Sequence, residues 1–89
     1  MNENKLNALE KFALLPNLNI FGHDCDYIVV NKEEDEGYAP TLYYYDKRYI
    51  MDWIGDEHDS ILDFSGNTPE EAIDEAFDFC KNNNLIKII

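Results

Sequence analysis

The sequence GNTPEEAIDEAFDF, residues 66–79, contains the strongest structural signal in the chain. Thr68 is a preferred N-cap residue, and Pro69 suits the first helical position because that position needs no N–H donor. Glu71 can close a capping box by accepting from the backbone N–H of the cap. Acidic side chains in this first turn also lie near the positive end of the helix dipole. These signals predict a helix over residues 68–82.

This predicted helix has one apolar face and one acidic face, because each kind of residue recurs at helical spacing. The apolar face consists of Ala72, Ile73, Ala76, Phe77 and Cys80. The acidic face consists of Glu70, Glu71, Asp74, Glu75 and Asp78. We therefore expect the apolar face to pack on a sheet and the Asn82–Asn84 run to end the helix.

Three or four strands are predicted before this helix, in segments rich in β-branched and aromatic residues. Side chains alternate along a strand, so Tyr49, Met51 and Trp53 share one face of the third segment. Turn-forming residues separate the segments, with Gly22 as the expected turn of the first connection. The predicted strands are residues 27–32, 41–45 and 49–54, and a shorter fourth strand over residues 60–64. The predicted connections are residues 17–26, an acidic loop over 33–40, and turns over 46–48 and 55–59.

Residues 3–14 carry apolar side chains at helical spacing, and Pro16 is expected to end this N-terminal helix. The C-terminal sequence LIKII, residues 85–89, can add an edge strand. The order of elements predicts an α+β fold, an antiparallel sheet of three to four strands with an N-terminal helix and a C-terminal helix packed on it. The length predicts a single domain over residues 1–89.

The charge balance is strongly acidic: 19 Asp and Glu oppose 7 Lys and Arg, for a formal net charge of −12. Direct binding to nucleic acid is disfavoured, because phosphate contacts need clustered basic side chains. The acids can serve solubility alone, or they can form a field directed at a basic partner. The second alternative predicts a basic protein as the partner.

The sequence MNENKLNALEKF at the N-terminus lacks the apolar core of a signal peptide, and no apolar run is long enough to span a membrane. We therefore expect a cytoplasmic protein, with Cys25 and Cys80 reduced and unpaired. Cys80 falls on the apolar helix face, where a thiol is usually a small core residue.

Two short stretches contain residue types that bind metals, but their spacing matches neither a C-x-x-C nor an H-E-x-x-H pattern. They are His23, Asp24, Cys25 and Asp26, and then Glu57, His58 and Asp59. The chain also shows no nucleophile motif and no phosphate-binding glycine loop. We therefore expect no metal, no cofactor and no enzymatic activity, and a small metal-dependent hydrolase is kept as an alternative.

The acidic and tyrosine-rich segments form the candidate binding site, because aromatic side chains anchor interfaces and charges steer association. The Glu33–Glu36 run carries the main argument, since its self-repulsion serves no evident folding role. The candidate partner-binding residues are Glu33, Glu34, Asp35, Glu36, Tyr38, Tyr43, Tyr45, Asp56, Glu57 and Asp59. A rigid negative patch of this kind can occupy a basic nucleic-acid groove.

In size, charge, tyrosine content and Lys/Asn/Ile-rich style, the chain resembles small acidic proteins carried by phages and mobile elements. These include anti-CRISPR proteins, anti-restriction proteins and uracil-DNA glycosylase inhibitors, several of which mimic the charge of DNA. Separately, residues 66–79 are similar to the turn and helix start of HicB-like antitoxin folds. The first resemblance implies an inhibitor, and the second implies an antitoxin.

The sequence thus predicts an acidic, phage-borne inhibitor in the host cytoplasm, which blocks the basic surface of a nucleic-acid-binding host protein or nuclease. The alternative is an antitoxin or immunity-type protein that neutralises a basic toxin. The oligomeric state stays open, a homodimer included.

Overall fold

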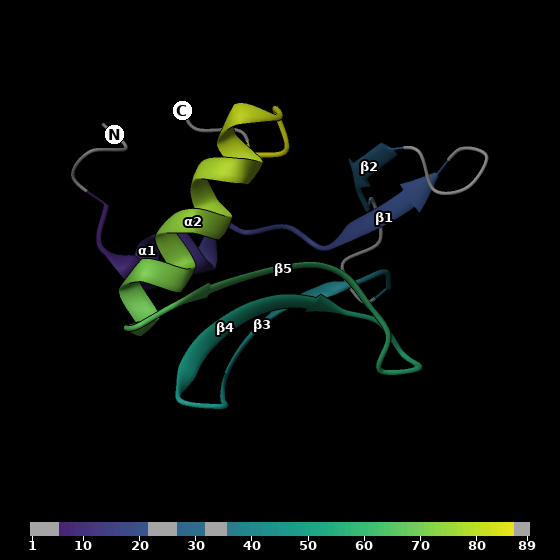
Figure 1. Cartoon of the computed structure of the whole chain (residues 1–89). Coiled ribbons are helices and arrows are strands. Elements are labelled where there is room, and N and C mark those ends of the chain that lie inside the picture. The colour runs from purple at the N-terminus through teal and green to yellow at the C-terminus, as the bar shows by residue number, and fades with distance from the viewer. Residues whose placement is uncertain (1–5, 22–26, 32–35, 87–89) are drawn as a thin grey trace.

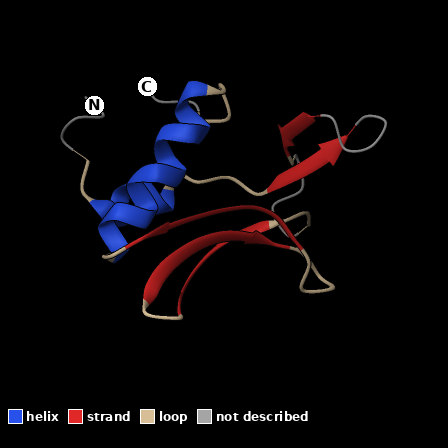
Figure 2. Ribbon diagram, viewed as in Figure 1, coloured by secondary structure: helices blue, strands red, loops and turns tan. Residues whose placement is uncertain are grey.

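The computed structural model of the chain describes residues 6–21, 27–31 and 36–86, and within these ranges seven elements follow one another (Figures 1 and 2). The fold is α+β, as predicted, with both helices on the same side of a curved three-stranded sheet (Figure 1). The elements are α1 (Ala8–Ala13), β1 (Leu18–Phe21), β2 (Tyr27–Val30), β3 (Ala39–Tyr45), β4 (Arg48–Ile54), β5 (Ser60–Gly66) and α2 (Pro69–Asn82).

The larger sheet is an antiparallel meander of β3, β4 and β5. Asp46 and Lys47 form the two-residue turn between β3 and β4, with φ of 51° and 66°. Two consecutive positive φ values are typical of the type I′ turn, whose twist matches that of the flanking strands. The strand over 41–45 begins earlier than predicted, at Ala39, because Pro40 is tolerated on an edge strand.

A second sheet pairs β1 with β2, with Leu18 opposite Val30. Leu18 also joins this hairpin to the larger sheet. Its N–H donates to the Tyr38 carbonyl (2.9 Å), and its carbonyl accepts from the Tyr38 N–H (2.8 Å). The prediction of an irregular connection over residues 17–26 is wrong for β1. Its four residues pair with β2, and Leu18 also pairs with Tyr38, neither of which local sequence reveals.

The core lies between α2 and the larger sheet. The apolar face predicted for α2 is confirmed, since all five of its members are buried. From the sheet, Met51 and Trp53 are fully buried beneath it, and Tyr49 is partly buried. The Trp53 Nε1–H donates to the Pro16 carbonyl at 2.9 Å, which ties the chain between α1 and β1 to the core.

The start of α2 is capped as predicted by Thr68, whose hydroxyl accepts from the Glu71 N–H at 3.1 Å. The predicted capping box is not formed. The Glu71 carboxylate instead accepts from the Asn67 N–H at 2.8 Å, one residue before the cap. Because Gly66 has no side chain, this segment can approach the first turn: a Cβ there would lie 2.6 Å from the Glu71 Cβ.

The predicted N-terminal helix over residues 3–14 is shorter in the structure, because Asn7 begins α1 with a capping box to Glu10. Residues 1–5 lie outside the described part of the chain. Leu85 and Ile86 pack against the core but form no strand, and residues 87–89 of the predicted edge strand are not described.

Candidate protein-interaction site

The turn between β4 and β5 carries three carboxylates within four residues, those of Asp56, Glu57 and Asp59, on an ordered backbone. The Gly55 N–H donates to the Asp59 carbonyl at 2.9 Å, and the His58 N–H donates to the Gly55 carbonyl at 3.0 Å. His58 has φ of 63°, which reverses the chain before β5 begins. Asp56 and Glu57 occupy the tip of this turn, and their side chains are exposed.

Tyr38 lies against this turn from the neighbouring end of β3. Its hydroxyl donates to Oδ2 of Asp59 at 2.6 Å, which fixes the orientation of that carboxylate. Gly55 allows the ring to approach, because a Cβ on Gly55 would lie 2.9 Å from Cε2 of Tyr38 and 2.9 Å from Oδ1 of Asp59. The tyrosine and the acidic turn therefore form one preorganised unit.

These residues surround an open hollow of about 290 Å³, which we call the acidic hollow. Its volume lies just below the range for small-molecule pockets, which is about 300–1,000 Å³. One or two side chains of a partner fit this size better than an enclosed substrate does. The acidic hollow is lined by Gly37, Tyr38, Gly55, Asp56, Glu57 and Asp59.

No basic side chain of the described chain forms an ion pair with the carboxylates of the acidic hollow. The salt bridge in these ranges joins Lys11 of α1 to Asp74 of α2 at 2.9 Å. The hollow therefore presents uncompensated negative charge beside an aromatic ring. Lysine and arginine are the side chains that this combination attracts, by charge and by contact with the ring face.

Glu36 is exposed and directly precedes Gly37 of the hollow. Its backbone carbonyl accepts from Nδ2 of Asn17 at 3.0 Å and from Nδ2 of Asn31 at 2.6 Å. These two amides hold the Glu36 backbone against the β1–β2 hairpin. Glu33, Glu34 and Asp35 of the predicted site lie outside the described residues.

Tyr43 does not belong to the acidic hollow. It projects from the opposite sheet face, where its hydroxyl donates to Oδ2 of the buried Asp52 at 2.9 Å. Ser60 donates to the other oxygen of the same carboxylate. The hydrogen bond to Asp52 is the main cause that raises the pKa of Tyr43 above its usual value of 10.0. Tyr43 thus has a structural partner within the chain.

Tyr45 lies at the far end of β3 and is 69% exposed. It is seven positions from Tyr38, which corresponds to about 24 Å along an extended strand at about 3.4 Å per residue. The structure therefore brings Tyr38, Asp56, Glu57 and Asp59 together and places Tyr43 and Tyr45 elsewhere. Tyr43 and Tyr45 therefore do not line the acidic hollow.

Sequence reasoning missed the glycines and asparagines that shape the site. Gly37 has φ of 87°, and a Cβ there would lie 2.8 Å from the Leu18 carbonyl oxygen. The signal available in the sequence was the position of Gly37 and Gly55 directly beside acidic runs. Asn17 and Asn31 carried no such signal, because only the folded hairpin brings them to Glu36.

Comparison with protein-family models, curated proteins and solved structures finds no match.

The described residues also contain no group of three or more His, Cys, Asp or Glu side chains placed to hold a metal ion. His58 is exposed in its turn, and His23, Asp24, Cys25 and Asp26 lie outside the described ranges. Cys80 is unpaired and buried, and burial raises the pKa of its thiol to about 11. Among the helices described, none is long and apolar enough to cross a membrane.

Proposed function

We propose that the protein is an acidic inhibitor that binds the basic, nucleic-acid-binding surface of another protein through its acidic hollow. The observation that supports this proposal is the arrangement of Tyr38 with Asp56, Glu57 and Asp59. Three carboxylates and a tyrosine ring converge there on an open space of about 290 Å³. A basic side chain that normally contacts a phosphate finds both a negative charge and an aromatic surface in this hollow.

Preorganisation strengthens this interpretation. The hydrogen bond from Tyr38 holds the Asp59 carboxylate in place before any partner arrives, so less side-chain freedom is lost on binding. The exposed Asp56 and Glu57 add a field that attracts a basic partner over distance, and this effect weakens as salt is added. The formal net charge of −12 extends that field over the molecule.

The proposal is tested by capture and displacement. The immobilised protein is exposed to host lysate at low salt, bound proteins are identified, and a short duplex DNA is then added. The proposal expects a basic nucleic-acid-binding protein that the duplex releases in competition. A captured protein that the duplex does not release would contradict mimicry of nucleic acid. If that protein is a small basic toxin, the result would favour the antitoxin alternative.

A further inference from the structure

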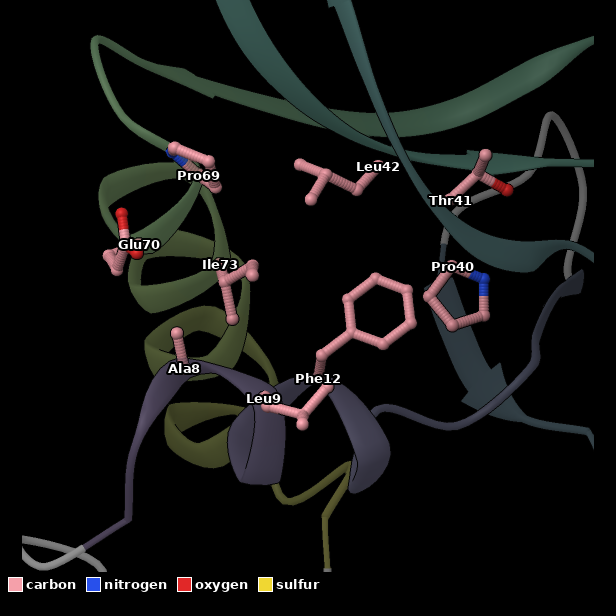
Figure 3. A pocket seen from close by; sticks show the side chains of 9 residues that line it. All are labelled: Ala8, Leu9, Phe12, Pro40, Thr41, Leu42, Pro69, Glu70 and Ile73. Atoms are coloured by element: carbon pink, nitrogen blue, oxygen red, sulfur yellow. The ribbon is translucent and has the colours of Figure 1, made fainter.

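An apolar groove of about 430 Å³ lies between α1, α2 and the edge strand β3. Figure 3 shows Phe12, Leu42 and Ile73 pointing toward one another across it, from the three different elements. Leu9 lies at its mouth and is 76% exposed. Glu70 is the charged residue among the described residues that line it. The groove shares no residue with the acidic hollow, so a ligand can bind in the groove whether or not the hollow binds a partner.

The backbone of β3 presents unpaired groups along the same groove. The N–H and C=O of Tyr38 point away from β4, because both bond to Leu18 of β1. Backbone groups alternate in direction along a strand, so those of Leu42 and Tyr44 also point away from β4. The two-residue turn gives the same assignment. Tyr45 and Arg48 close this turn as a hydrogen-bonded pair, so the backbone groups of Tyr45 point toward β4 and those of Tyr44 point away from it.

The strand β1 covers only the start of this edge. On the N-terminal side of Leu18 the chain leads back to α1. The Pro16 carbonyl there accepts a hydrogen bond from Trp53 and not from β3. Within the described ranges, no backbone group bonds to Leu42 or Tyr44 from the outer side. The edge from Pro40 to Tyr44 is therefore an open continuation of the ladder that Leu18 and Tyr38 begin.

We propose that this edge and groove bind an extended, basic segment of a partner protein, which adds a strand to β3 and inserts an apolar side chain beside Phe12. Strand addition supplies main-chain hydrogen bonds to Leu42 and Tyr44, and the groove selects the side chain. Glu70 has no ion-pair partner among the described residues, so it favours a lysine or arginine in the segment. A second copy of this chain is disfavoured, because it would bring another formal charge of −12 to the same edge.

The test uses a synthetic acetylated and amidated peptide of the sequence Lys-Thr-Lys-Leu-Thr-Val-Lys-Thr. It is titrated into isotope-labelled protein, and the backbone amide signals are followed by NMR. The proposal expects saturable shifts of the Leu42 and Tyr44 amides together with slower hydrogen exchange at both. The same peptide with glutamate in place of each lysine should bind at least about tenfold more weakly.

Two charge-matched variants complete the test, since Leu9 and Leu14 are both exposed but only Leu9 lines the groove. Leu9→Lys should weaken binding of the lysine peptide by about tenfold or more, and Leu14→Lys should leave it unchanged. Three results would overturn the proposal: no shift at Leu42 and Tyr44, equal binding by Leu9→Lys and Leu14→Lys, or protection of both amides in a homodimer without peptide.

Discussion

Lys47 lies at a turn position where glycine is the usual residue. Its φ of 66° is in the left-handed region, which is unfavourable for a residue with a side chain by about 1 kcal/mol. Lys47→Gly should therefore raise the free energy of unfolding by about 1 kcal/mol in a urea titration, with no change in fold. Lys47→Ala removes the same charge but keeps the strained conformation, so it serves as the control. Equal stabilisation by both variants would show that charge, and not backbone strain, is responsible.

Tyr43 gives a prediction for pH. Its pKa is raised because its hydroxyl donates to the Asp52 carboxylate, an interaction that ionisation of the phenol removes. The folded state thus favours the protonated phenol, so the stability from this bond is fully present below pH 10.0 and is lost as the pH rises through the raised pKa.

The measurement is an ultraviolet titration of tyrosine ionisation in the wild type and in Tyr43→Phe. The difference between the two curves isolates Tyr43, and its midpoint should lie above 10.0. A midpoint at or below this value would show that the hydrogen bond to Asp52 is absent in solution.

The hydrogen-bond partner of Tyr43 could not be predicted from the sequence. The tyrosines were recognisable as candidate anchors, but their partners depend on strand register. Asp52 lies opposite Thr41, so Tyr43 reaches it diagonally across β3 and β4. No local pattern distinguishes Tyr43, which has this internal partner, from Tyr45, which is exposed at the turn.

At the scale of elements, α2 was predictable because its signals are local. Its cap, its proline and its apolar spacing all lie within residues 68–82, and its buried face agrees residue by residue with the structure. β1 was missed for the opposite reason. It has only four residues, and it is stabilised by pairing with β2 and with Tyr38, which is distant in the sequence.

The buried face of α2 gives a direct test of its packing. Phe77 is 1% exposed, and Lys11 lies over its ring at 5.5 Å from the centroid. Phe77→Ala should lower the free energy of unfolding by about 3–5 kcal/mol, because it leaves a cavity in the core. Leu9→Ala, at a residue that is 76% exposed, is the control and should change it little. An unchanged thermal midpoint for Phe77→Ala would mean that this face of α2 is not the core face.

At the scale of the whole molecule, the sequence predicted the charge but not its distribution. Residues 56–59 were recognised as acidic, yet their position beside Tyr38 depends on the β4–β5 turn folding back onto the start of β3. The separation of Tyr45 from this site, about 24 Å along the strand, follows from the same topology. The net charge follows from the composition alone, whereas the position of each charge on the surface depends on the fold of the chain.

The central claim is that the acidic hollow steers and holds a basic partner, so two variants with the same charge change should behave differently. The first combines Asp56→Asn with Glu57→Gln in the hollow. The second combines Glu75→Gln with Asp78→Asn on the exposed face of α2. Each removes two negative charges, so both change the formal net charge from −12 to −10 (−12 + 2 = −10).

The decisive measurement is the association rate of each variant with the captured partner across a salt series. The hollow variant should associate more slowly than the wild type, with a shallower dependence on salt, because close interface charges steer encounter more than distant ones do. The α2 variant should stay close to the wild type in both respects. Equal rates and equal salt slopes for the two variants would contradict the account, because net charge alone would then explain binding.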